Sequence, residues 1–242
     1  MEYAVYESPA VSAPVDERTS YLRKVGVWTL MGLGTSTVTA LGSAAFFAFV
    51  GSALLSSQLV TMGVILGCWF GAHYGCGALV NGNGSASTKA MGLLAGSALQ
   101  GVALGVLLLM AVAVSAEALG NPLALLFQAI ALVGVTAIGM CGYLLTGPRN
   151  LSPVRAILGV MTIPMLIAMA VSFVFPVNGM LGILMSVGFV AFSSLALLYQ
   201  LNLVIHQLST KQHIEGAFMV TMGLLVLFWN VLVLLMRLNS RD

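Results

Sequence analysis

The residues best suited to chemistry in this chain are polar side chains that interrupt long apolar runs. Five amides do so, namely Gln100, Gln128, Gln200, Asn202 and Asn230. An amide that faces lipid is costly, so these side chains should face other helices, a water-filled cavity or the headgroup region. They can join helices through hydrogen bonds, or they can line a path for an ion. The first of these roles is the more common one for an amide inside a membrane.

Catalysis inside a bilayer requires nucleophiles, acids or metal ligands that are grouped in a wet pocket. The apolar runs carry no Asp, Glu, Lys or Arg well inside them, and the serines Ser193 and Ser194 have no histidine that the sequence places nearby. His73 and Cys76 share a helix face, but two ligands are too few for zinc. We therefore expect neither an enzyme nor a bound metal or cofactor.

Composition indicates a membrane protein that crosses the bilayer several times. The 242 residues are 60% hydrophobic and only 7% charged, and the mean hydropathy is +1.05. A soluble domain usually has about 25% charged residues. The formal net charge of +2 is too small to attract nucleic acid. The partner that composition does indicate is the lipid bilayer.

Hydropathy predicts seven membrane-spanning helices, each near the roughly 20 residues that cross the hydrocarbon core. The predicted spans are residues 25–50, 59–80, 90–114, 123–145, 154–175, 180–205 and 216–238. We expect an all-α bundle in which residues 23–242 form a single transmembrane domain. Residues 1–22 are polar and are predicted to form a flexible cytoplasmic tail. The last span could alternatively be re-entrant, which would return the C-terminus to the cytoplasm.

The sixth predicted span, residues 180–205, carries amides near its inner end. Helical steps back from Gln200 reach Ala196 and Ser193, so small and hydroxyl side chains share a face with the amide. Small residues on a helix face allow another backbone to approach closely. We interpret this face as the buried seam of the bundle.

Glycines recur at every fourth residue of the second predicted span. They are Gly63, Gly67, Gly71 and Gly75, and together they form one smooth stripe. Such a stripe favours close contact between helix backbones. We predict that it packs against another helix.

Basic residues are unevenly divided between the two sides of the predicted bundle. One side holds Arg18, Arg23, Lys24, Lys89, Arg149, Arg155 and Lys211, whereas the other holds Arg237 and Arg241. Loops rich in Lys and Arg stay on the cytoplasmic side of the membrane. This bias predicts a cytoplasmic N-terminus and an external C-terminus.

Several sequence motifs occur in a characteristic order. They are YLRK before the first span, ALQGVALG at residues 98–105, YLLTGPRNLS at 143–152, FSSLALLYQ at 192–200 and LFWNVLVLLMRL at 227–238. Together they resemble the Bax inhibitor family, a seven-helix group that includes bacterial inner-membrane proteins associated with the FtsH protease. In that family an acid often stands at the position of Gln100.

The resemblance implies a bacterial inner-membrane protein that regulates other membrane proteins, such as a membrane protease. In the calcium-leak members of the family, two aspartates form a pH-sensitive latch, and the corresponding positions here are Gln200 and Leu227. Paired carboxylates share a proton, whereas an amide and a leucine cannot titrate. The alternative function is therefore a passive cation leak that lacks this latch, with calcium as the ion in question.

Overall fold

The computed structural model describes residues 9–49, 57–146, 151–174 and 179–240, and these residues form helices and short links without a strand. The elements are η1 (Ala10–Ser12), α1 (Val15–Phe49), α3 (Gln58–Phe70), the π-helix η2 (Gly71–Cys76), α4 (Gly77–Asn81), α5 (Ala86–Leu119), α6 (Ala124–Leu145), α7 (Ser152–Val174), α8 (Gly179–His206) and α9 (His213–Asn239). The predicted all-α class is confirmed.

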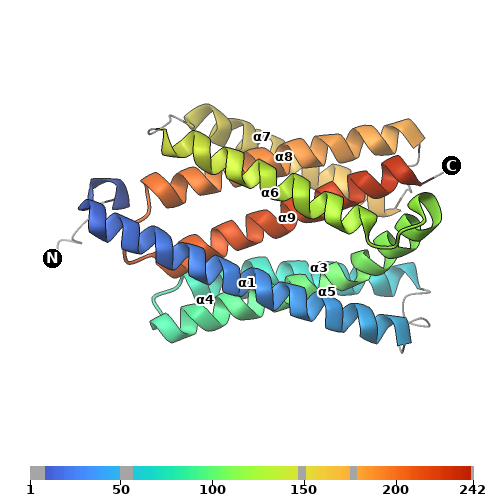
Figure 1. The fold of residues 1–242 in the computed structure, drawn as a ribbon, viewed down its shortest axis with the longest axis horizontal. Coiled ribbons are helices and arrows are strands. Elements are labelled where there is room, and N and C mark those ends of the chain that lie inside the picture. The colour runs from blue at the N-terminus through green and yellow to red at the C-terminus, as the bar shows by residue number, and fades with distance from the viewer. Residues whose placement is uncertain (1–8, 50–56, 147–150, 175–178, 241–242) are drawn as a thin grey trace.

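The helices form a membrane bundle. In the described part of the chain, six helical segments are long and apolar enough to cross a membrane, and Ser152–Ala168 of α7 forms a shorter apolar helix. The first helix, α1, begins at one end of the bundle and α9 finishes at the other (Figure 1). Helix α9 is one continuous helix of 27 residues, which favours a full crossing of the last span over the re-entrant alternative.

Helix α9 forms the core of the bundle. It runs between a group formed by α6, α7 and α8 and a group formed by α1, α3, α4 and α5 (Figure 1). In its most apolar window 50% of the residues are buried, compared with 17–39% in the other candidate spans. Contacts with neighbours on several sides explain why this helix is apolar around most of its circumference.

A close backbone approach joins α1 to α5. A Cβ atom added to Gly101 would overlap the Thr39 hydroxyl and the Ser36 carbonyl oxygen, and one added to Gly105 would overlap the Ser43 hydroxyl. The Ser43 hydroxyl also lies 3.5 Å from the carbonyl oxygen of Gly101. These two glycines therefore bring the two backbones together, as small residues do at helix contacts in membranes.

The folded part of the chain begins closer to the N-terminus than the sequence predicted. Helix α1 begins at Val15, and Ala10 is fully buried, with its backbone N–H donating to the carbonyl oxygen of Leu208 over 2.8 Å. The Thr210 hydroxyl donates to the Glu17 carboxylate over 2.5 Å. The prediction of a flexible tail is thus wrong for residues 9–22, because the link between α8 and α9 supplies partners that local composition does not reveal. Residues 1–8 lie outside the described part.

The glycine stripe of the second span faces mostly away from the bundle. Among the described residues, no heavy atom would lie within 4 Å of a Cβ added to Gly63, Gly67 or Gly75, whereas one added to Gly71 would lie 3.1 Å from Leu99 of α5. The interpretation of the stripe as a contact inside the bundle is therefore wrong for three of the four glycines. The π-helix η2 begins at Gly71, and its wider turn changes the face that each later residue presents.

We expect Gly101→Ala to lower the thermal stability of the purified protein, because its methyl group would collide with α1. Overpacking of this kind costs about 1 to 3 kcal/mol. Gly67→Ala is the matched control, since its methyl group meets open space among the described residues and alanine has the higher helix propensity. Thermal unfolding in detergent measures both variants. Equal unfolding midpoints would contradict the assignment of Gly101 to this close contact.

Candidate functional site

Gln200 of α8 meets the central helix at Gly223. A Cβ atom added to Gly223 would overlap Gln200 Oε1 and would lie 3.0 Å from Leu197 Cδ1. The oxygen Gln200 Oε1 is buried and has no hydrogen-bond partner among the described residues. Leu227 follows Gly223 by one helical turn, and only 1% of it is exposed. The absence of a side chain at Gly223 thus leaves the space that the buried oxygen of Gln200 occupies.

Two further acceptors on α8 lack partners. Asn202 is 3% exposed, and its Oδ1 is buried without a hydrogen bond in the described part of the protein. The same holds for Nδ1 of His206, whose other ring nitrogen, Nε2, lies 3.3 Å from the carbonyl oxygen of Leu144 in α6. In a neutral ring whose Nε2–H donates to that carbonyl, Nδ1 is an acceptor. The C-terminal end of α8 thus carries buried acceptor atoms that a further donor or a cation can contact.

Four hydroxyls gather where α1, α5 and α9 meet. A Cβ atom added to Gly32 of α1 would lie 3.0 Å from Ser97 Oγ and from Thr221 Oγ1. Thr29 and Ser36 lie one turn on either side of Gly32, and all four hydroxyl oxygens are buried without a partner among the described residues. Sequence reasoning missed this cluster. The sequence feature that could have indicated it is that hydroxyl side chains recur on one face of the first span.

Gln100 joins α5 to the second span through His73. Its amide nitrogen Nε2 lies 3.3 Å from His73 Nδ1, which also lies 3.1 Å from the carbonyl oxygen of Trp69. The rings of Trp69 and His73 stack with their centroids 4.5 Å apart. Sequence spacing could not pair residues on separate helices, and the π-helix that carries His73 orients the ring.

The other two predicted amides lie in different environments. Gln128 is exposed near the start of α6, so of the three predicted environments the structure does not support contact with a neighbouring helix. Its position close to the helix end allows the side chain to reach the headgroup region instead. Asn230 of α9 is half-buried. The structure thus brings Gln200 and Asn202 to one end of α8 and places Gln100 at a separate contact.

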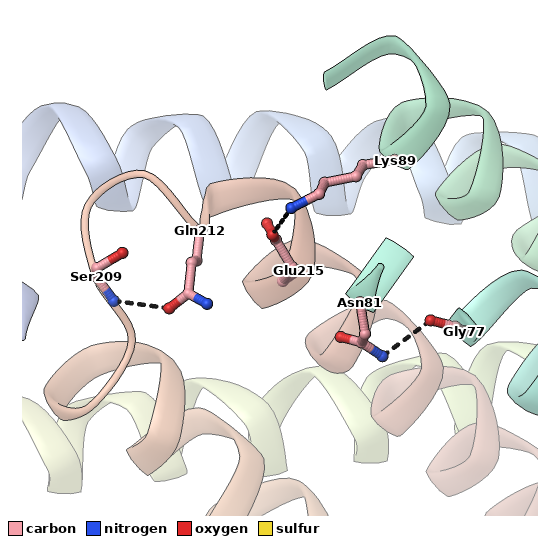
Figure 2. A network of polar contacts seen from close by, with 6 residues as sticks. All are labelled: Gly77, Asn81, Lys89, Ser209, Gln212 and Glu215. Atoms are coloured by element: carbon pink, nitrogen blue, oxygen red, sulfur yellow. Dashed lines mark hydrogen bonds and ion pairs between the residues drawn. The ribbon is translucent and has the colours of Figure 1, made fainter. Parts of the chain in front are cut away.

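An ion pair secures the end of the bundle at which α5 and α9 begin. Lys89 Nζ lies 2.5 Å from Glu215 Oε1, and the two side chains are 23% and 9% exposed (Figure 2). Nearby, the Tyr21 hydroxyl donates to the carbonyl oxygen of Val204 over 3.0 Å, which ties α1 to α8. Among the described residues, no three His, Cys, Asp or Glu side chains are grouped as metal ligands would be. These contacts are suited to holding helices together.

We expect Glu215→Gln to lower thermal stability by about 1 to 3 kcal/mol, because it leaves the Lys89 ammonium group with a neutral partner in a mostly buried place. The double variant Lys89→Met with Glu215→Leu removes both charges and should recover part of this loss. Thermal unfolding of the three proteins measures the effect. A double variant that is less stable than Glu215→Gln would contradict the assignment of a buried charge pair.

Comparison with known proteins identifies the family. The family model described as "Inhibitor of apoptosis-promoting Bax1" matches residues 18–241. A search of curated proteins found no match. The family match covers α1 and every later helix of the bundle, and it agrees with the order of motifs along the chain. The protein therefore belongs to the Bax inhibitor family.

Proposed function

We propose that this protein regulates other membrane proteins by binding them within the bilayer, and that a membrane protease is such a partner. We further propose that it resides in a bacterial inner membrane with its N-terminus in the cytoplasm. Lys24, Lys89 and Lys211 gather at the end where α1 begins, and Arg237 lies in the last turn of α9. This asymmetry supports the proposed orientation.

The observation that carries the regulatory function is the outward glycine face of the second span. Gly63, Gly67 and Gly75 are exposed, and a Cβ atom at any of them would meet no described atom within 4 Å. Glycine lowers the stability of a helix by about 1 kcal/mol relative to alanine, and contact with lipid does not offset this loss. Close packing of a second transmembrane helix on the stripe would offset it.

The architecture agrees with a binding role. The Bax inhibitor family is not a known enzyme family. The exposed glycines lie on α3 and η2, whereas the tight glycine contacts at Gly101 and Gly105 hold the bundle together on the inner side of α5. A partner helix could therefore dock on the outer face without disturbing the core. The bundle would present a rigid surface to its partner.

We expect Gly67→Leu to abolish association with a partner protein while the bundle remains folded. The leucine would hold a partner backbone away from α3, and it would meet open space within the described chain. The measurement is copurification after mild crosslinking in native membranes, with the captured proteins identified by mass spectrometry. Gly139→Leu on α6 is the matched control, because Gly139 is also exposed and without a described neighbour within 4 Å.

The expected pattern is the loss of a stoichiometric protease partner in Gly67→Leu and its retention in Gly139→Leu, with equal thermal unfolding midpoints. If both variants retain the same partner, the glycine face is not part of the binding site. A fall in stability confined to Gly67→Leu would show that the glycine packs within this chain.

A second candidate function is a passive cation leak that lacks the paired-acid latch. The observation that favours it is the set of unpaired acceptors at Gln200, Asn202 and His206, which a permeating cation could contact. The latch-equivalent positions hold an amide at Gln200 and a buried leucine at Leu227. Neither side chain changes its charge with pH. The leak would therefore not be gated by the titration of these two positions.

We expect any calcium flux through the wild-type protein to show no switch between about pH 6 and pH 8, and Gln200→Asp with Leu227→Asp to introduce one. Two close carboxylates in a partly buried site share a proton, so one pKa rises toward neutrality and the pair gains a charge as pH increases. Dye-loaded liposomes at matched protein content measure the flux, and Gln200→Asp alone is the control. A clear pH dependence in the wild type would show that these positions do not gate the protein.

A further inference from the structure

A polar cavity of about 340 Å³ lies between the start of α1 and the link from α8 to α9. Its lining carries three basic side chains, which are Lys24 from α1, Lys211 from the link and His213 from the first residue of α9. The hydroxyls of Ser20 and Thr210 also line it. Ammonium groups and hydroxyls that converge from separate elements are suited to the oxygens of an anion.

Two carboxylates near the cavity, those of Glu17 and Glu215, have hydrogen-bond or ion-pair partners of their own. Glu17, which also lines the cavity, accepts a hydrogen bond from the Thr210 hydroxyl over 2.5 Å. Glu215, in the first turn of α9, points to Lys89 and pairs with it (Figure 2). The charge of Glu215 is thus balanced by a lysine outside the cavity. Among the described residues that line the cavity, the lysines are Lys24 and Lys211 and the carboxylate is that of Glu17.

The positive end of a long helix adds to this charge. Helix α9 begins at His213, beside the cavity, and its N-cap residue Gln212 makes no side-chain capping bond. Its Oε1 instead accepts from the backbone N–H of Ser209 over 3.1 Å (Figure 2). The first backbone N–H groups of a helix, together with its dipole, favour a negative ligand. The cavity therefore combines basic side chains with a helix N-terminus that Gln212 leaves uncapped.

A second cavity, of about 250 Å³, adjoins the first along α1. The two share Ser20 and Lys24, and the lining of the second is completed by Arg23, Val27 and Trp28. Val27 is 50% exposed. The first cavity therefore adjoins a second one that carries a further basic side chain and an apolar wall of Val27 and Trp28. Tryptophan is typical of the boundary between lipid headgroups and hydrocarbon.

We propose that the two cavities together form a binding site for one anionic phospholipid. Its phosphate lies among Lys24, Lys211 and the start of α9, and the first part of its acyl chains lies against Val27 and Trp28. The apolar wall is what favours a lipid over a soluble phosphate, because an inorganic anion has no group to place there. This site is independent of the proposed protein partner, because its lining residues belong to α1, α9 and the link between α8 and α9, and not to α3.

The test uses the full-length protein in vesicles and the fluorescence of Trp28. Phosphatidylglycerol with brominated acyl chains, a short-range quencher, is titrated into unlabelled phosphatidylcholine, and brominated phosphatidylcholine is titrated in parallel. The difference in quenching between wild type and Trp28→Phe isolates the signal of Trp28 from those of the other two tryptophans. Lys24→Gln and Lys211→Gln each remove one charge from the cavity. Arg155→Gln removes one from an exposed position on α7 and is the matched control.

The expected result is preferential quenching of Trp28 by phosphatidylglycerol. The preference should fall about fivefold in Lys24→Gln and in Lys211→Gln, which corresponds to about 1 kcal/mol per basic residue near an anionic lipid, and should be unchanged in Arg155→Gln. Equal quenching by both lipids, or equal effects of all three charge variants, would overturn the proposal. Loss of the preference in millimolar inorganic phosphate would assign the cavity to a soluble anion and would also overturn it.

Discussion

The close backbone contact between α1 and α5 is the constraint on which the rest of the bundle depends. Gly101 and Gly105 leave no room for side chains at this contact, so the hydroxyls and carbonyl oxygens of α1 lie directly against α5. Lipid tails are as apolar as leucine side chains, so close packing and hydrogen bonds, rather than the exclusion of water, hold helices together in a membrane. Once α1 and α5 are joined, they provide the surface against which α9 packs.

The bundle pairs its polar groups at one end and leaves several unpaired further inside. Where α5 and α9 begin, Lys89 and Glu215 form an ion pair, and Tyr21 ties α1 to α8. Gln200 Oε1 and the Thr221 hydroxyl, by contrast, are buried without a partner in the described part of the chain. An unpaired buried polar atom costs about 1 to 3 kcal/mol. A new hydrogen-bond partner or a bound ligand would therefore stabilise the interior more than it would stabilise the end held by Lys89 and Glu215.

The sequence predicted which polar residues matter better than it predicted their partners. Gln100 was expected to join helices, and its amide nitrogen lies within hydrogen-bonding distance of His73 on the second span, a partner that the sequence did not indicate. Gln200 was expected on a buried seam, and its half-buried side chain places a buried oxygen against Gly223. Residues on different helices are brought together by the packing of the bundle, which leaves no trace in local spacing. For the same reason the hydroxyl cluster around Gly32 could not be predicted.

The sequence by itself determined the membrane class, the helical structure and the approximate positions of the six long apolar helices. It could do so because an apolar run of about 20 residues in a bilayer must satisfy its backbone internally, and a helix does this within one segment. The tertiary structure alone decided what each helix face meets. Gly63 and Gly67 have the same four-residue spacing as Gly101 and Gly105, yet the first pair faces outward and the second lies against another helix. Spacing determines which residues share a face, whereas the rotation and neighbours of each helix determine what that face contacts.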